Sequence, residues 1–301
     1  MTALRYLHLD VFPASPGGGN HLGVVIGAEE WSAAAMQRFA RWANLVETTF
    51  LLPAQSAEAD YRVRIFAPDR EIPFAGHPAI GSAHAALDCG LAQPHGQLLR
   101  QESAAGILPI RVEGNGATRE LLLRSPDADV LAAGVDAHAL LPAALVGIRL
   151  GELPPALVHG GRRWWVAEVA DEASLRGWQP DHAAIGALAR ASSSMGLCAF
   201  SRGKEFLKAD GEPGACQVVV RAFGPGAGIV EDPASGAANG LVAAYLANAE
   251  PGGRLARGYT VSQGREIGHD ARLTVLMEAG AIWVGGRCRT IIDGSLDWPA
   301  A

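Results

Sequence analysis

Three ionisable residues, Glu47, His77 and Asp232, have the chemical types and the sequence settings that proton-transfer chemistry requires. His77 and Asp232 each precede a Pro-Ala pair and a run of small residues, and they occupy equivalent positions of an internal repeat. Different polar groups at equivalent places of a symmetric scaffold are what proton transfer needs. The sequence therefore predicts acid–base chemistry.

Glu47 lies in a segment whose alternation predicts a strand with Leu45, Glu47, Thr49 and Leu51 on one face. If that face is buried, the apolar neighbours raise the pKa of the carboxyl group toward the range useful in catalysis. If Leu45 and Leu51 face solvent instead, Glu47 is an ordinary exposed acid. The corresponding region of the second half, residues 192–200, carries no acid, so we expect a single base.

The repeat consists of V-R-x-F-x-P, a short loop, and then His or Asp followed by P-A-x-G. It occurs at residues 63–83 and again at 220–238, with one two-residue difference in loop length. The first part of each copy reads as a strand that ends at a proline. The chain is therefore expected to contain two similar halves.

A helix should follow each strand, because the second proline of each copy suits the first helical position. We expect helices from Pro78 to about Cys89 and from Pro233 to about Asn248, with the preceding His or Asp at or near the N-cap. Both helices are small or apolar nearly all round, which is typical of buried helices. Each half is thus predicted to be a sheet wrapped around one central helix. A further helix is expected at 32–43, with Asn44 at its end.

Few side chains surround the two predicted helix starts, so their backbone N–H groups and the positive ends of the helix dipoles are accessible to an anion. Two such starts related by a pseudo-twofold would point at one cleft between the halves. Alternatively, Asp232 is a plain N-cap and the small residues serve only packing.

Composition narrows the function classes. With 301 residues, 49% of them hydrophobic, the chain has material for about two domains, which we place at 1–126 and 127–301, where the last strand can return to the first domain. A net charge of −6 without a dense Lys/Arg run argues against nucleic acid, and no apolar stretch is long enough for a membrane helix. Four scattered cysteines and no secretory signal predict reduced thiols in a cytoplasmic protein.

Other motifs predict little chemistry. The G-G-G-N run at 17–20 follows a strand-like segment and lacks the spacing of nucleotide-binding loops, so it is either a tight turn or a ligand contact. His77 and His84 lack the spacing and the nearby acids of a metal site, and we expect no metal and a packed His84.

Several segments together resemble the PhzF-like family of phenazine-biosynthesis isomerases, which has the diaminopimelate-epimerase fold. These segments are L-D-V-F-P-A-S-P-G-G-G-N-H-L-G-V-V, N-L-V-E-T-T-F-L-L, the two repeat copies, and V-S-Q-G-R-E-I-G-H near the end. The resemblance implies an α+β fold with two pseudo-symmetric domains, each an open antiparallel barrel around a central helix. It also implies a homodimer that uses no cofactor.

By the same resemblance, Glu47 moves a proton between two carbons of a small carboxylate-bearing substrate, while His77 and Asp232 hold its polar groups and assist catalysis. The substrate carboxylate would lie on backbone N–H groups near Gly76 and Gly236. Further substrate contacts are expected from Asn20, Ala237, Gln263 and Gly264.

Two departures from the family pattern leave the phenazine substrate unassigned, because they indicate either weaker binding or a different substrate. Ala237 replaces a Ser whose hydroxyl would contact ligand, a loss of about 1–3 kcal/mol, and His21 stands where the family has Pro. Two other functions remain open: an amino-acid epimerase or racemase, and a non-catalytic protein that binds a metabolite or a protein partner. A two-thiol epimerase is excluded, because Ala75, Ala234 and Ser235 occupy the places of its cysteines.

Overall fold

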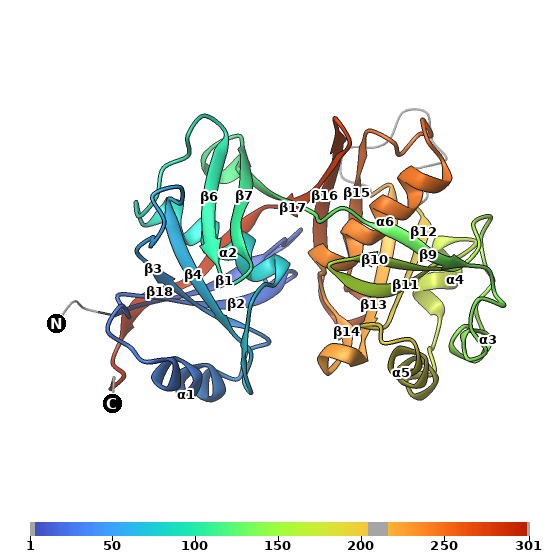
Figure 1. Cartoon of the computed structure of the whole chain (residues 1–301), viewed down its shortest axis with the longest axis horizontal. Coiled ribbons are helices and arrows are strands. Elements are labelled where there is room, and N and C mark those ends of the chain that lie inside the picture. Colours follow the sequence, from blue (N-terminus) through green and yellow to red (C-terminus); the bar gives the residue numbers. More distant parts are fainter. Residues whose placement is uncertain (1–3, 204–215, 300–301) are drawn as a thin grey trace. The chain divides into compact units, whose positions relative to one another are not determined.

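The computed structural model describes residues 4–203 and 216–299. The chain divides into two compact units. Unit 1 comprises Met1–Arg124 together with Gly285–Ala301, and unit 2 comprises Ser125–Val284. The C-terminal strand belongs to unit 1, because β18 (Cys288–Leu296) pairs along its length with β1 (Leu4–Val11), as Figure 1 shows in red and blue.

The described part of unit 1 is built from short strands and two α-helices. The helices are α1 (Ala33–Ala43) and α2 (Gly76–Asp88). Besides β1 and β18, its strands are β2 (Asn20–Ile26), β3 (Thr48–Leu52), β4 (Tyr61–Phe66), β5 (Glu71–Ile72), β6 (Leu98–Ser103), β7 (Gly106–Glu113) and β8 (Glu120–Arg124).

Unit 2 repeats this plan with additional helices. Its helices are α3 (Leu141–Ala144), α4 (Glu172–Gly177), α5 (His182–Ala191) and α6 (Gly236–Ala249). Its strands are β9 (Asp129–Ala133), β10 (Ala156–Gly160), β11 (Arg162–Glu168), β12 (Leu197–Arg202), β13 (Val218–Gly224), β14 (Ile229–Asp232), β15 (Gly258–Gln263) and β16 (Ala271–Glu278). Strand β17 (Ala281–Gly286) follows β16 in the chain and leads to β18.

The ladders of the two units have the same order and direction. In unit 1, β1–β2 is antiparallel, β2–β3 parallel, β3–β4 antiparallel, β4–β6 parallel and β6–β7 antiparallel. In unit 2, the pairs β10–β11, β11–β12, β12–β13, β13–β15 and β15–β16 follow the same sequence of directions. The predicted α+β fold and its doubling are confirmed, with two parallel pairs in each unit.

Each unit has one central helix. Helix α2 contacts seven strands of unit 1, namely β1, β2, β3, β4, β6, β8 and β18, and α6 contacts β9, β10, β11, β12 and β16 of unit 2. Both helices carry small side chains on most faces, so strands can approach them from several directions. The predicted arrangement of a sheet around a buried helix is therefore confirmed for each unit.

The predicted helix starts were wrong by two or three residues. Helix α2 begins at Gly76 with Ala75 as its N-cap, so His77 lies within the first turn. Helix α6 begins at Gly236 with Ser235 as its N-cap, and Asp232 is the last residue of β14. The physical reason is that Pro only fixes its own φ; the hydroxyl of Ser235 accepts from the Ala238 N–H and sets the start of α6. The predicted helix at 32–43 is confirmed, with Asn44 as a left-handed C-cap.

Candidate active site

In unit 1, two of the predicted catalytic residues lie together. The Nε2 atom of His77 approaches Oε2 of Glu47 to 3.4 Å, and the two side chains are only 7% and 13% exposed. His77 comes from the first turn of α2, and Glu47 comes from the connection between α1 and β3. The contact does not have hydrogen-bond geometry, and catalytic hydrogen bonds are often long before a substrate binds.

His77 is held in its neutral form. Burial lowers the pKa of the imidazole to about 3, against the opposing effect of a hydrogen bond to the backbone of His21. That bond raises the pKa, as expected when a ring N–H donates to a carbonyl oxygen. Because the nitrogen near Glu47 is Nε2, the ring presents a lone pair to the carboxyl group when Nδ1 carries the proton. The pair can then hold one proton between an oxygen and a nitrogen.

Glu47 does not lie within the predicted strand. Strand β3 begins at Thr48, and Leu45 and Glu47 belong to the turn that follows the left-handed Asn44. The left-handed conformation of Asn44 turns the chain away from the helix direction. Residues 45–47 therefore connect α1 to the sheet, and the strand begins only at Thr48. Glu47 is nevertheless mostly buried, so it is not an ordinary exposed acid.

The G-G-G-N segment is a tight loop that leads into β2 at Asn20. The buried carboxylate of Asp10 accepts hydrogen bonds from the N–H groups of Gly17 and Gly19, both at 2.7 Å. A side chain at Gly19 would clash, since its Cβ would lie 2.3 Å from the carbonyl oxygen of Val11. Asn20 is 2% exposed and its position is set by this loop.

The start of α2 offers backbone donors. Among the described residues, Ala75 makes no side-chain cap hydrogen bond, and Pro78 at the third position has no N–H. The N–H groups of Gly76 and His77 therefore have no acceptor within the helix and can donate to another group. The positive end of the helix dipole favours an anion at the same place.

In unit 2, the buried side-chain amides of Gln263 and Asn239, which we call the amide clasp, hold the loop that carries Asp232. The Gln263 amide donates from Nε2 to the carbonyl oxygen of Asp232 at 2.8 Å, and its Oε1 accepts from the Ser235 N–H and from Nδ2 of Asn239. Asn239 also donates to the Ser235 carbonyl at 2.8 Å, and both amide side chains are fully buried. The Asp232 carboxylate accepts from the N–H of Ala234.

Other predicted contacts surround this loop. Gly264 has a φ of +90°, and a Cβ there would lie 2.6 Å from the carbonyl oxygen of Pro233, so only glycine fits. Gly236 and Ala237 form the first turn of α6, and Ala237 is exposed. The assignment of these residues and of Gln263 to substrate binding stays a prediction.

Sequence reasoning missed the residues that brace these loops. Asp10, Asn239 and the ion pair between Arg221 and Glu231 were not identified as functional supports. Asp10 carries a readable signal, because it is an acid in an apolar strand directly before a glycine run. His84 is buried, as expected for a packed residue, and its ring also contacts Thr290, Asp88 and Arg119.

The described residues show no metal-binding cluster, no disulfide and no membrane-spanning helix. No three His, Cys, Asp or Glu side chains in residues 4–203 and 216–299 gather closely enough to hold a metal ion. The four cysteines are free thiols. In the same part of the chain, no helix combines the length and the apolar character needed to cross a membrane.

Comparison with known proteins identifies the family. Residues 9–294 match the family model of phenazine biosynthesis-like proteins (PhzC-PhzF), and the chain belongs to this family. A trans-2,3-dihydro-3-hydroxyanthranilate isomerase of Pseudomonas chlororaphis is 31% identical over 92% of this chain and 91% of the relative. A protein of Schizosaccharomyces pombe called antisense-enhancing sequence 1 is 29% identical over 98% of this chain and 99% of its own length.

A solved structure has the same fold. The PhzF-family protein of Bacillus anthracis superposes with a TM-score of 0.80 over 98% of this chain and 99% of the other, at 24% sequence identity. This likeness concerns the fold. The family match and the named relatives identify the chain as an isomerase of the PhzF family.

Proposed function

We propose that the protein isomerises a small carboxylate-bearing molecule by moving a proton between two of its carbon atoms. The Glu47 carboxylate removes a proton from one carbon, and the resulting carboxylic acid, whose proton exchanges with solvent, returns a proton to another carbon. The substrate gains and loses one proton, so its composition is unchanged and the scheme needs no cofactor. General acid–base catalysis by one positioned group typically contributes about 10²–10⁴-fold to the rate.

The contact between Glu47 and His77 carries the proposal. A neutral imidazole whose lone pair lies 3.4 Å from a mostly buried carboxyl group can accept a hydrogen bond from the protonated acid. It thereby supports the state in which Glu47 has just taken the substrate proton. A protonated imidazole would instead stabilise the ionised carboxylate and make it a weaker base toward the substrate proton.

The proposed substrate class follows from the backbone donors and from the named relatives. The first-turn N–H groups at Gly76 and Gly236 suit a carboxylate, and Asp232 suits a hydroxyl or amino group of the substrate. The relative from Pseudomonas chlororaphis is named for a substrate, dihydro-hydroxyanthranilate, that carries such groups. We propose a related cyclic or unsaturated acid, because Ala237 and His21 depart from the family pattern.

We also propose that the protein acts as a homodimer in the cytoplasm. The free thiols of Cys89, Cys198, Cys216 and Cys288 suit a reducing compartment.

The test is turnover of trans-2,3-dihydro-3-hydroxyanthranilate and of a panel of related unsaturated acids in D₂O, followed by ¹H NMR. The wild type is expected to introduce deuterium at a carbon different from the one that loses hydrogen. Glu47→Gln should lower kcat by about 10²–10⁴-fold. The matched control is Glu30→Gln, which removes an exposed acid from the same unit and should leave kcat unchanged.

The position of the deuterium separates the candidate functions. Exchange at one stereocentre without a double-bond shift would indicate an epimerase. Binding without any exchange would indicate a non-catalytic protein, and unchanged turnover by Glu47→Gln would remove Glu47 from the mechanism.

A further inference from the structure

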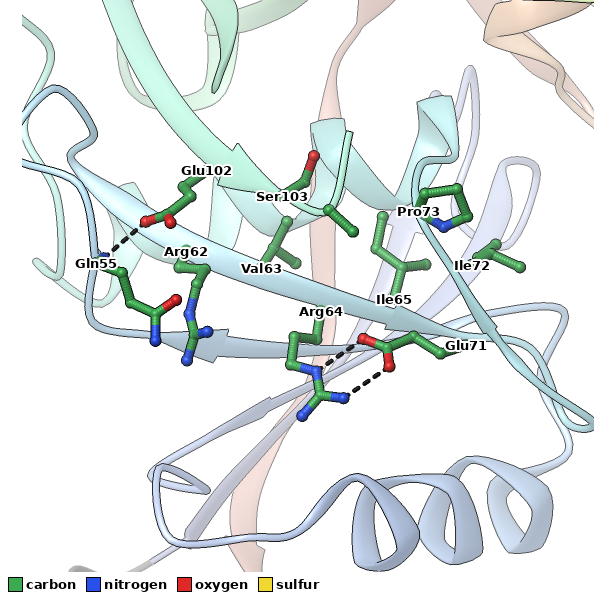
Figure 2. Close-up of a pocket in the computed structure, with 11 residues that line it drawn as sticks. Gln55, Arg62, Val63, Arg64, Ile65, Glu71, Ile72, Pro73, Glu102 and Ser103 are labelled. Atoms are coloured by element: carbon green, nitrogen blue, oxygen red, sulfur yellow. Dashed lines mark hydrogen bonds and ion pairs between the residues drawn. The ribbon is translucent and has the colours of Figure 1, made fainter. Parts of the chain in front are cut away.

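Unit 1 contains a pocket at one edge of β4, with a volume of about 170 Å³. We call it the β4 notch; its walls are residues 62–65, 71–73 and 102–104, together with Gln55. Figure 2 shows that Val63 and Ile65 leave β4 on one side and Arg62 and Arg64 on the other. Residues from both faces of the strand line the same pocket, so the β4 notch lies at the edge of the strand.

The strand ladders explain why the edge is open. Strand β4 pairs with β6 only at Tyr61 and Arg62, and with β5 only at Ile65 and Phe66. Among the described residues, Val63 and Arg64 therefore have a ladder partner only on the opposite edge, in β3. Backbone polar groups at such an edge require another partner or water.

Unit 2 closes the equivalent place with a side chain. Val220 of β13 is the repeat counterpart of Val63, and it pairs with Gln263 of β15. The Gln263 amide reaches across to the Asp232 carbonyl in β14. The register of β4 and β6 places Ser103 at the position of Gln263. Its short hydroxyl group turns back to the carbonyl of Gly106, so it cannot span the gap.

The charged side chains around the β4 notch have hydrogen-bond partners except at Arg62. Glu71 is engaged by Arg64 through two hydrogen bonds of 2.7 Å. Glu102 accepts from the backbone N–H groups of Gln55 and Ser56. Within the described residues, the side chain of Arg62 makes no hydrogen bond or ion pair, although its Nε is buried. Buried guanidinium nitrogens ordinarily have an acceptor.

We propose that the β4 notch is a second binding site, independent of the isomerase site, for a small monocarboxylate with an apolar body. Arg62 would bind the carboxylate through two parallel hydrogen bonds, as guanidinium groups commonly do. Val63, Ile65 and Ile72 would contact the apolar part. The volume suits a single six-membered ring, since a cavity of about 150 Å³ is large enough for benzene.

The experiment titrates ¹⁵N-labelled full-length protein with benzoate and, separately, with the uncharged isostere benzamide. The Arg62 Nε–H signal, assigned by its loss in Arg62→Gln, is expected to shift with benzoate and at least about tenfold more weakly with benzamide. The backbone N–H signal of Val63 reports binding to the β4 notch in the variants, and Arg62→Gln should weaken this binding of benzoate at least about tenfold. Ser103→Gln copies the side chain that closes unit 2 and should also abolish binding.

Variants at the isomerase site distinguish the two sites. His77→Gln should leave benzoate binding unchanged, and Arg62→Gln should leave isomerase turnover unchanged. The proposal is overturned if millimolar benzoate shifts no Arg signal. It is also overturned if benzoate shifts the Val63 signal equally well in a folded Arg62→Gln variant, or if His77→Gln abolishes that shift. Circular dichroism melting curves verify that each variant is folded.

Discussion

The hairpins that lead into the two central helices carry the same ion pair in different surroundings. In unit 1, Arg64 forms two hydrogen bonds with Glu71 and lies over the ring of Phe66, and the two charged side chains are 24% and 36% exposed. In unit 2, Arg221 forms the same pair of bonds with Glu231, and the two side chains are 6% and 5% exposed.

The difference comes from what covers each hairpin. Arg221 also donates to the carbonyl oxygens of Leu175 and Trp178 at the end of α4, and it lies over the ring of Phe223. No helix equivalent to α4 precedes the hairpin in the described part of unit 1. The arginine of the repeated V-R-x-F motif therefore forms an ion pair that stabilises the hairpin in both units. In unit 2, the additional helix α4 also buries this ion pair.

The largest predicted effect concerns these two arginines. Arg221→Leu should destabilise the protein by about 3–5 kcal/mol, because it leaves Glu231 as a buried, unpaired charge. Arg64→Leu removes the equivalent, more exposed pair and should cost only about 0–1 kcal/mol. Urea unfolding of both variants measures the difference, and equal losses would contradict the account of burial.

The second prediction concerns the pH dependence that His77 gives to unit 1. Its pKa is lowered from 6.5 to about 3 by burial, so below pH 6.5 the unfolded chain binds a proton that the folded chain does not. The stability contributed by the neutral ring is complete above pH 6.5 and is lost as the pH falls toward 3. His77 should contribute a slope of up to about 1.4 kcal/mol per pH unit in this window.

The measurement is the unfolding free energy between pH 6.5 and 4.5 for wild type and His77→Gln. The variant should show a shallower slope, whereas His159→Gln, which changes an exposed histidine of unit 2, should keep the wild-type slope. Identical slopes for wild type and His77→Gln would show that the ring is not buried as described.

The third prediction compares two buried glutamines. Gln263 holds the Asp232 loop, whereas Gln101 in unit 1 donates to Tyr61 and to the carbonyl of Ala79. Replacing either with Leu should cost about 1–3 kcal/mol, because buried polar groups lose their partners. Only Gln263→Leu should raise KM, by about tenfold, since only this variant displaces Asp232. A similar rise in KM for Gln101→Leu would remove the special role of the clasp.

The smallest effect is expected at the start of α6. Ala237 is exposed, so a hydroxyl group can be accommodated there. Ala237→Ser should lower KM for trans-2,3-dihydro-3-hydroxyanthranilate by about two- to tenfold, which corresponds to one added hydrogen bond of about 0.5–1.5 kcal/mol. Ala237→Gly, which adds no donor, serves as the comparison and should not improve binding.

The sequence predicted the features that recur in both copies of the repeat. Periodicity and the repeated V-R-x-F-x-P motif were sufficient for strands β4 and β13 and for the two buried helices. The helix starts could not be placed from proline alone, because the Ser235 cap and the end of β14 set them. The contact of Glu47 with His77 depends on long-range packing of the turn after Asn44, which no local pattern encodes.

The central claim is that Glu47 moves the proton and that Asp232 only holds the substrate. Its most direct test is the rate of deuterium incorporation into saturating trans-2,3-dihydro-3-hydroxyanthranilate, measured by NMR for Glu47→Gln and Asp232→Asn. The account predicts that Glu47→Gln loses at least about 10²-fold in rate, while Asp232→Asn loses less than about tenfold and is affected mainly in KM. An equal loss in the two variants, or full exchange by Glu47→Gln, would contradict it.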